Sequence, residues 1–561
     1  MNDVLHSVAN SNFLWGHCIS RGLADLGVRQ VFFSPGSRST PLVLGCEREE
    51  RIDCLPVLDE RTASFMAIGQ AKRTGFPTVL ICTSGSAPTH WYPAVTEAHY
   101  SGIPLILLSA DRPSELQECG AGQTINQLNL FGKFVRSFHC LPTPNSSIKK
   151  IRELQDILIS SYTDATSQTS GPVHINVPFR EPLWPLKGSE PKLPNFEKIT
   201  LPTSIADRKE ITQTEKISQY AQTSSRPIIV AGLDCPDHIL REFKNIPIFC
   251  DSLSPLRENE HPSRILRYEN LLRSESFKNS NCPDQFLILG SLPTSKTLRA
   301  WIEQNNSTRI VIEPSGRRVD PLSGESKAFS ISFKNIMGLK YPNVELGWLE
   351  KWQLGESKIE NSFKQIFETI SFDKEPKILR ILSESLPPQS HLFIANSMPI
   401  RDAEWFWQPS DHKRFFYGAR GVNGIDGTLG TAFGIAHGNA SATFLLTGEL
   451  AFLHDSHALL SAKNLNGSLT VFLINNDGGG IFENLSVRGL PEFEKCFATP
   501  QACNFSELCK AHDIEFRLCS SEKCIKSWAE KPQEKGIRVL EIRTNRKIDR
   551  EIRQQLLSIS P

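Results

Sequence analysis

The strongest constraint on the fold of this chain is the regular alternation of short apolar runs with longer segments of helical periodicity. The apolar runs fall into three successive groups, at 31–33, 78–82, 105–109, 173–177, then 227–231, 248–250, 286–289, 309–312, and finally 392–395, 442–446, 470–474 and 539–542. Short strands that alternate with helices form parallel sheets covered by helices on both faces. The sequence therefore predicts an α/β protein with three doubly wound domains.

The length of the chain also requires several domains. A chain of 561 residues exceeds what one hydrophobic core supports, because chains beyond roughly 250 residues divide into domains. The stretch from about 184 to 202 is rich in Pro, Lys and Glu without periodicity, which is typical of a surface linker. We expect an N-terminal domain over 1–185, a central domain over 200–345 and a C-terminal domain over 370–561.

The composition excludes several kinds of partner. The formal net charge is +1, so the chain lacks the basic excess of a nucleic-acid-binding protein. Its longest apolar runs, such as 104–108 and 471–474, are far shorter than the roughly 20 residues that span a bilayer. The 14 cysteines include no Cys-x-x-Cys pair, and the first ten residues do not resemble a secretory signal. We expect a cytoplasmic protein whose partners are small molecules and other subunits.

Two polar turns late in the chain each follow an apolar strand. The first is Gly448-Glu449, and the second is Asn475-Asn476 followed by Gly478. A carboxylate, an amide oxygen and a backbone carbonyl are ligands that suit Mg²⁺, and glycine lets the backbone approach a diphosphate closely. Either turn alone would be ordinary loop chemistry. Together they resemble the metal-binding motif of thiamin-diphosphate enzymes, although Glu449 stands where that family has aspartate.

An acidic residue early in the chain has a counterpart in the same enzymes. Glu60 follows an apolar segment and precedes the helix-like stretch 63–72. Viewed alone, it is an acid that complements the dipole at a helix N-terminus. In thiamin-diphosphate enzymes an early glutamate hydrogen-bonds N1′ of the aminopyrimidine and favours the imino tautomer, whose 4′ nitrogen removes the proton from C2 of the thiazolium. The resemblance makes Glu60 the expected catalytic residue.

Five further motifs carry polar residues, and the first directly follows a predicted strand. They are Ser-Pro-Gly-Ser-Arg-Ser-Thr-Pro-Leu at 34–42, Ala-Asp-Arg-Pro at 110–113, Cys-Gly-Ala-Gly-Gln at 119–123, Ala-Asn-Ser-Met-Pro-Ile-Arg at 395–401 and Arg-Gly-Val-Asn-Gly-Ile-Asp-Gly at 420–427. A turn after a parallel strand lies at the carboxyl edge of the sheet, where open α/β sheets bind ligands. With these motifs the chain, from about residue 12 to 544, resembles the MenD family of 2-succinyl-5-enolpyruvyl-6-hydroxy-3-cyclohexene-1-carboxylate synthases.

The resemblance implies a transferase of menaquinone or phylloquinone biosynthesis. In this family thiamin diphosphate, with Mg²⁺ or Mn²⁺, decarboxylates 2-oxoglutarate, and the succinyl carbanion equivalent adds in a 1,4 fashion to isochorismate. Both substrates are carboxylates, so the site needs fixed positive charge, for which arginine is well suited. The family places its cofactor between the first domain of one subunit and the last domain of another, which implies a homodimer or a homotetramer.

The family motifs also assign roles to individual residues of this chain. The resemblance implies cofactor contacts at Ser397, Ile425, Gly448 and Asn475. It implies metal ligands at Glu449, Asn476 and Gly478. It implies substrate contacts at Ser37, Arg38, Arg112, Gln123, Lys296, Asn396, Arg401, Arg420, Ile481 and Phe482. Viewed one at a time, such cations are more often exposed or structural ion pairs, such polar residues are caps or turns, and such apolar residues belong to a core.

Two departures from the family pattern leave other functions open. Thr297 follows Lys296 where some members have a second basic residue, and Glu449 is one methylene longer than the expected aspartate. The alternatives are another thiamin-diphosphate decarboxylase or carboligase with a different 2-oxo acid, and a non-catalytic binding protein. The presence of Glu60 argues against a binding protein, which has little need of a ring-activating acid. For His454 and His457 we expect ordinary residues on one helix face, because a zinc site needs a third ligand nearby.

Overall fold

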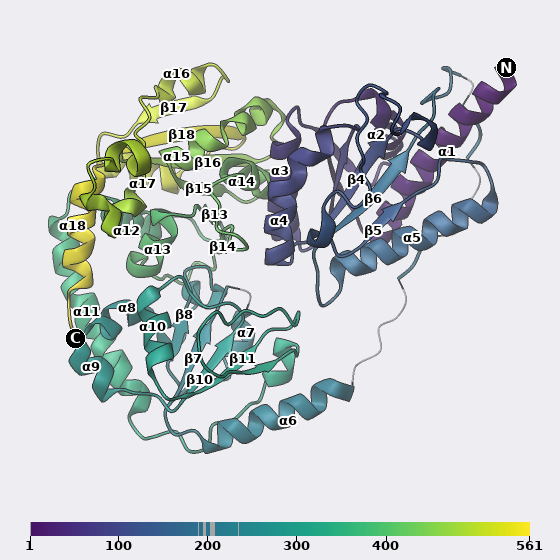
Figure 1. Ribbon diagram of the computed structural model, residues 1–561. Helices are drawn as coiled ribbons and strands as arrows, with labels where there is room; N and C mark the ends of the chain where they lie inside the picture. The colour runs from purple at the N-terminus through teal and green to yellow at the C-terminus, as the bar shows by residue number, and fades with distance from the viewer. Residues whose placement is uncertain (1, 189, 194–197, 202–207, 234) are drawn as a thin grey trace. The chain divides into compact units, whose positions relative to one another are not determined.

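Three six-stranded sheets of parallel strands form the framework of the protein (Figure 1). The computed structural model describes residues 2–188, 190–193, 198–201, 208–233 and 235–561. Within these residues the paired strands of the three sheets run parallel, including the long pair of eight residues between Ser468–Asn475 and 536–543. The predicted α/β class with doubly wound parallel sheets is confirmed.

The first sheet has the strand order β2-β1-β3-β4-β6-β5. Its strands are β1 (Gln30–Phe33), β2 (Asp53–Pro56), β3 (Thr78–Cys82), β4 (Leu105–Asp111), β5 (Phe138–Cys140) and β6 (Pro172–Pro178). The helices of this part are α1 (Asn2–Leu26), α2 (Thr40–Glu47), α3 (Glu60–Thr74), α4 (Tyr92–Ser101) and α5 (Ile148–Thr166). The central strands β3 and β4 are buried along their whole length, because helices cover both faces of a parallel sheet, and this explains their continuous apolar sequences.

The second sheet has a different order, β12-β11-β10-β7-β8-β9. Its strands are β7 (Pro227–Ala231), β8 (Ile248–Cys250), β9 (Arg264–Ile265), β10 (Gln285–Leu289), β11 (Thr308–Ile312) and β12 (Lys327–Phe329). The helices of this part are α6 (Arg208–Thr223), α7 (Asp237–Leu240), α8 (Tyr268–Arg273), α9 (Glu275–Ser280), α10 (Lys296–Gln304) and α11 (Trp348–Thr369). Counted from β9, this is the 3-2-1-4-5-6 order of the dinucleotide-binding fold, with its switch point between β7 and β10.

The third sheet repeats the strand order of the first, as β14-β13-β15-β16-β18-β17. Its strands are β13 (His391–Ile394), β14 (Phe415–Tyr417), β15 (Thr443–Gly448), β16 (Ser468–Asn475), β17 (Glu515–Leu518) and β18 (Gly536–Arg543). The helices of this part are α12 (Glu375–Ser385), α13 (Met398–Phe406), α14 (Thr428–Ala436), α15 (Glu449–His454), α16 (Phe505–Lys510), α17 (Glu522–Glu530) and α18 (Arg546–Leu557). Its switch point lies between β13 and β15.

The chain forms two compact units. The first consists of Met1–Ser204, Ala419–Asn439 and His454–Gly467, and the second of Ile205–Gly418, Ala440–Leu453 and Ser468–Pro561. The second unit therefore holds both the second and the third sheet. The three domain limits expected from the sequence stay a prediction. None of the helices that the structure describes combines the length and the apolar character needed to cross a membrane.

Buried arginines join the second and third sheets inside the second unit. Arg257 donates through Nη2 to the carbonyl oxygen of Glu404 at 2.6 Å. Arg267 donates through its two terminal nitrogens to the carbonyl oxygens of Trp405 at 2.7 Å and Trp407 at 3.0 Å. A guanidinium group has five donors in a fixed plane, so one arginine can satisfy several buried carbonyls at once. These bonds connect the two sheets within the second unit.

Two glycines let helices α1 and α2 touch backbone to backbone. A Cβ on Gly16 would lie 2.1 Å from the carbonyl oxygen of Pro41, and a Cβ on Gly45 would lie 2.4 Å from that of Gly16. Helix α2 begins directly after the turn Ser37–Ser39, which follows β1. The close helix crossing therefore holds this turn at the carboxyl end of β1.

We expect Gly16→Ala to destabilise the first unit by about 1 to 3 kcal/mol, because the added methyl group overlaps a backbone atom that cannot move aside alone. Thermal denaturation of the purified protein measures the change. The control is Gly489→Ala, because a Cβ at Gly489 meets no atom within 4 Å and its backbone does not lie in the left-handed region. Equal melting temperatures for the two variants would contradict the close backbone contact between α1 and α2.

Candidate active site

The polar turns of the first unit gather at the switch point of the first sheet. Strand β1 connects onward to β2 on one side, whereas β3 connects to β4 on the other, so the carboxyl ends of β1 and β3 lie at the position where open α/β sheets bind ligands. The turn with Ser37 and Arg38 follows β1, and Ser84 follows β3. Gly36 has no room for a side chain, since its Cβ would lie 2.4 Å from the Cβ of Thr83. The two turns are thus in contact.

Ser84 connects three segments of this edge. Its buried hydroxyl accepts a hydrogen bond from Nη1 of Arg112 and donates to the carbonyl oxygen of Gln123 at 3.1 Å. Nε2 of Gln123 donates in return to the Ser84 carbonyl at 3.2 Å. The structure therefore brings Arg112 and Gln123, two of the expected substrate contacts, to the same serine. Ser84 was not foreseen from the sequence, although it lies two residues after the buried strand β3, where functional residues of such sheets often occur.

Arg38 and Arg112 carry like charges close to each other. Arg38 is 5% exposed and donates to the carbonyl oxygen of Phe179 at 2.9 Å and to Oε1 of Glu181 at 2.8 Å. The pKa of Arg112 is lowered, mainly because the group is partly buried and secondly because the charge of Arg38 is nearby. Arg112 also lines a cavity of about 600 Å³. Because the two guanidinium groups repel each other, a carboxylate bound beside them would be stabilised.

Glu60 is the first residue of α3, so it lies at the N-terminus of a helix. The preceding Asp59 caps this helix, since its Oδ1 accepts a hydrogen bond from the backbone N–H of Thr62 at 2.7 Å. Glu60 is half-buried, and its charge adds to burial in raising the pKa of Cys82, the last residue of β3. The Glu60 carboxylate is therefore close to the carboxyl end of a central strand, where a ligand of this sheet would bind.

A buried carboxylate holds the turn that begins at Arg420. Glu97 of α4 accepts hydrogen bonds from the backbone N–H groups of Gly421 at 3.0 Å and Val422 at 2.8 Å. This carboxylate fixes the backbone directly after Arg420 and so sets where the arginine side chain begins. Half-buried Ile425 lies in the same turn. Glu97 could not be foreseen, because a helix sequence does not reveal a distant backbone partner.

In the second unit, the two turns expected to bind a metal ion face each other. Oε1 of Glu449 accepts a hydrogen bond from the backbone N–H of Gly478 at 2.5 Å. Glu449 is 2% exposed, and burial raises its pKa to about 7, which a bound cation would reverse. Oδ1 of Asn476 is buried and has no hydrogen-bond partner in the described part of the chain. A buried carboxylate beside an unsatisfied amide oxygen fits a site for a hard divalent cation.

Neighbouring residues hold the loop 475–478, called the metal loop after its proposed ligand, in place. Nδ2 of Asn475 donates to Oε1 of Glu541 at 2.8 Å, and Arg546 donates to the carbonyl oxygen of Asp477. Asp477 has a φ of 60° and Gly478 a φ of 131°, so both residues lie in the left-handed region that favours glycine. A Cβ on Gly448 would meet no atom within 4 Å, which leaves its backbone open to a ligand. This cradle fits the diphosphate group that the sequence motif implies.

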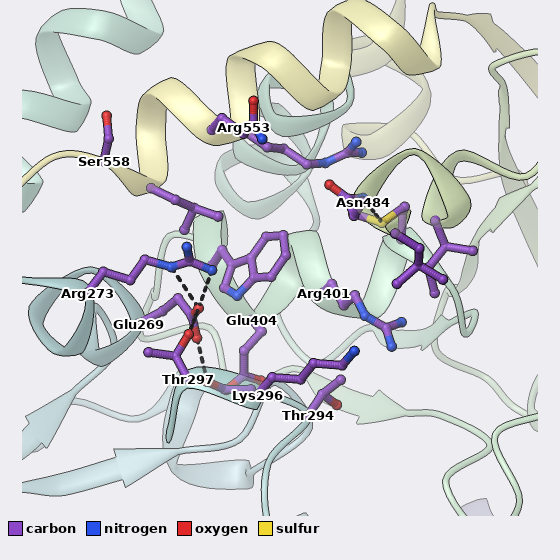
Figure 2. Close-up of a pocket in the computed structure, with 17 residues that line it drawn as sticks. Glu269, Arg273, Thr294, Lys296, Thr297, Arg401, Glu404, Asn484, Arg553 and Ser558 are labelled. Carbon is purple, nitrogen blue, oxygen red and sulfur yellow. Dashed lines mark hydrogen bonds and ion pairs between the residues drawn. The ribbon is translucent and has the colours of Figure 1, made fainter. Parts of the chain in front are cut away.

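Three residues implied in substrate binding line one cavity of the second unit. Lys296, Arg401 and Ile481 contribute to a cavity of about 660 Å³ (Figure 2). Thr297, the residue next to the lysine, donates its hydroxyl hydrogen to Glu269 at 2.7 Å, and the same carboxylate pairs with Arg273 at 2.8 Å. Thr297 thus adds no cation to the cavity but helps to hold Glu269 at its wall.

The remaining predicted contacts lie around the start of α13. Ser397 has a φ of 75°, which is rare for a residue other than glycine, and such strain often occurs at functional sites. Its carbonyl oxygen accepts a hydrogen bond from Arg401. Asn396 is buried beside it. Phe482 lies in the 3₁₀ turn 480–484 with its ring 5.9 Å from that of Phe497, and it is not among the residues that line the cavity.

The two histidines are not on one helix, so that expectation was wrong. Helix α15 ends at His454, whereas His457 belongs to the 3₁₀ helix Ser456–Asn464. Buried Asp455 separates them and accepts a hydrogen bond from the backbone N–H of Gly430 at 2.7 Å. Among the residues that the structure describes, no group of three or more His, Cys, Asp or Glu side chains could hold a metal ion.

Comparisons with known proteins agree with this arrangement. The family model described as "Thiamine pyrophosphate enzyme, N-terminal TPP binding domain" matches residues 15–130. A benzoylformate decarboxylase from Polynucleobacter necessarius has a similar fold, with a TM-score of 0.67 over 95% of this chain and 98% of that chain at 14% identity. The fold, the strand-end turns and the relatives of this chain define a thiamin-diphosphate-dependent enzyme.

Close relatives define the family more narrowly. The chain is 40% identical to the 2-succinyl-5-enolpyruvyl-6-hydroxy-3-cyclohexene-1-carboxylate synthase of Gloeothece citriformis (strain PCC 7424), over 97% of both chains. It is 38% identical to the synthase of the same name from Trichodesmium erythraeum (strain IMS101), over 96% of both. The chain belongs to this family, the MenD family, which confirms the resemblance found in its motifs.

We expect Ser84→Ala to loosen the edge of the first sheet. The change removes a hydrogen bond to the charged Arg112 and one to the Gln123 carbonyl, so the free energy of unfolding should fall by about 2 kcal/mol. Amide hydrogen exchange over 120–127 should become faster. The control is Ser86→Ala, because Ser86 is exposed and makes no capping bond. If exchange over 120–127 were the same in both variants, the linking role of Ser84 would be wrong.

Proposed function

We propose that this protein decarboxylates 2-oxoglutarate and adds the remaining four-carbon unit to isochorismate, as a transferase of menaquinone or phylloquinone biosynthesis. The observation that carries the proposal is that each unit of a chain of this family holds cations, after strands of the first sheet in one unit and along a cavity in the other. Arg38 and Arg112 lie at the edge of the first sheet, and Lys296 and Arg401 line the cavity of the second unit. Substrates with several carboxylates need this many fixed charges.

Thiamin diphosphate supplies a nucleophilic carbon at which a 2-oxo acid loses carbon dioxide and from which a new carbon-carbon bond forms. Glu60 is the residue proposed to bind and polarise the aminopyrimidine, because its carboxylate lies at the open edge of the first sheet. Gly448 and Asn475 would border the diphosphate, and Ser397 and Ile425 would add further contacts. The open space over Gly448 is the observation that favours a diphosphate there.

Mg²⁺ is the proposed metal ion, and Mn²⁺ should replace it because both prefer oxygen ligands in octahedral geometry. The ligands would be the Glu449 carboxylate, Oδ1 of Asn476 and the carbonyl oxygen of Gly478. The unsatisfied Asn476 oxygen and the buried Glu449 carboxylate support this assignment. The longer side chain of glutamate is compatible with it, since Glu449 already reaches the backbone of Gly478.

The substrate carboxylates would be held by the cations, with Arg420 as the fifth. Ser37, Gln123 and Asn396 are proposed to add neutral hydrogen bonds, and the apolar side chains of Ile481 and Phe482 to exclude water from the reacting carbon. We further propose a homodimer as the smallest active assembly.

We expect Glu60→Gln to lower turnover by at least about 100-fold, because glutamine cannot exchange a proton with the aminopyrimidine. Steady-state rates with both substrates measure the loss, and circular dichroism checks the fold. The control is Asp59→Asn, the neighbouring acid, because asparagine also caps helices and should keep both fold and rate. Near-normal turnover of Glu60→Gln would remove Glu60 from the mechanism.

The substrate proposal is tested by supplying 2-oxoglutarate, isochorismate, thiamin diphosphate and Mg²⁺ to the purified protein. We expect isochorismate absorbance to fall only when 2-oxoglutarate is present, and the product mass to equal both substrates less carbon dioxide. Pyruvate in place of 2-oxoglutarate should give no product. Carbon dioxide release without isochorismate consumption would instead establish a different decarboxylase, and no reaction at all would favour a binding protein.

A further inference from the structure

We propose that Glu375 is a positioning residue for the metal site, because it turns the amide of Asn476 so that Oδ1 faces the cation. Glu375 is the first residue of α12 and is 1% exposed, and Asn476 directly follows β16 and is 7% exposed. Nδ2 of Asn476 donates to Oε1 of Glu375 at 2.6 Å. The inference rests on the proposed function, in which Asn476 is a metal ligand.

The direction of this hydrogen bond follows from the chemistry of the partners. An amide side chain can present either its NH₂ group or its oxygen to a neighbour, and the choice decides what points the other way. A carboxylate that accepts at both oxygens can only receive the NH₂ group. The Asn476 oxygen is thereby turned away from Glu375 and, being buried without a partner in the described structure, is left for a cation.

Arg553 of α18 fixes the carboxylate in this accepting role. Nη2 of Arg553 donates to Oε2 of Glu375, and arginine cannot accept a hydrogen bond. The same guanidinium group donates to Oδ1 of Asp402 at 2.7 Å and to Oδ2 at 2.6 Å. The backbone N–H of Glu375 is held by Oδ1 of Asp549 at 3.0 Å. Both the backbone and the side chain of Glu375 are therefore fixed.

This arrangement makes a specific prediction for Glu375→Gln, which keeps the size and shape of the side chain. Arg553 can only donate, so the new amide must turn its oxygen toward Arg553 and its NH₂ group toward Asn476. Asn476 must then reverse and present its own NH₂ group to the metal position. We expect the affinity for Mn²⁺, measured with thiamin diphosphate by the electron paramagnetic resonance of free Mn²⁺, to fall by about 10- to 100-fold.

The matched control is Asp402→Asn. It also replaces a buried carboxylate with an amide at Arg553, but it does not touch Asn476. We expect it to lower the melting temperature in a similar way while leaving the Mn²⁺ affinity within about three-fold of the wild type. If both variants lost affinity equally, Glu375 would have only a structural role, and the proposal would be wrong.

A second change should rescue the first. In Glu375→Gln/Asn476→Asp, the aspartate can accept from the new NH₂ group with one oxygen and offer the other to the cation, so Mn²⁺ affinity should return toward the wild-type value. Asn476→Asp alone places two carboxylates against each other and should bind Mn²⁺ more weakly than the double variant. If Glu375→Gln does not fold, the comparison of the double variant with Asn476→Asp still tests the proposal. Mn²⁺ affinity of the double variant no higher than that of Asn476→Asp would overturn it.

The wild-type measurement separates this inference from the function on which it rests. Wild-type protein that does not bind Mn²⁺ in the presence of thiamin diphosphate would refute the proposed metal site itself. Wild-type protein that binds Mn²⁺, with Glu375→Gln equally tight, would leave that site in place and overturn only the role of Glu375.

Discussion

Parallel pairing of strands is the constraint on which the rest of this structure depends. In a parallel sheet every strand ends at the same edge, so the turns that follow different strands meet there, however far apart they are in sequence. Ser37, Ser84 and Arg112 reach one edge in this way, after β1, β3 and β4. Glu449 and Asn476 reach another, after β15 and β16. The buried strands supply no chemistry themselves, but they determine which turns can act together.

The same constraint explains which strands could be predicted. All twelve apolar runs of the sequence correspond to strands with a neighbour on each side, whereas the six strands that were not foreseen are β2, β5, β9, β12, β14 and β17, which form the edges of the sheets. An interior strand is covered on both faces and must be apolar throughout. An edge strand such as β17, with exposed residues at three of four positions, carries no such pattern. Such a strand is recognised only by its pairing with a neighbour in the folded sheet.

The candidate site was predictable where one short motif carries the chemistry. Arg112, Glu449 and Asn476 could be named because each lies in a turn after a strand, and the family motifs add Lys296 and Arg401. Residues that act through distant contacts could not be named. Ser84 meets Gln123 across 39 positions, Glu97 meets Gly421 across 324, and Glu375 meets Asn476 across 101. A serine after a strand or a glutamate on a helix is too common to signal such a partner. The structure also separated His454 from His457, because helix α15 ends at His454 and a 3₁₀ helix begins at Ser456.

The hydrogen bond between Glu449 and the backbone of Gly478 also affects how the proposed cation would be held. It joins Glu449 to the loop 475–478, and Arg546 holds the carbonyl oxygen of Asp477 in that loop. The carboxylate therefore has a fixed position before any ligand binds. A cation bound as proposed would lose less affinity to the ordering of its ligands than one bound by a mobile side chain.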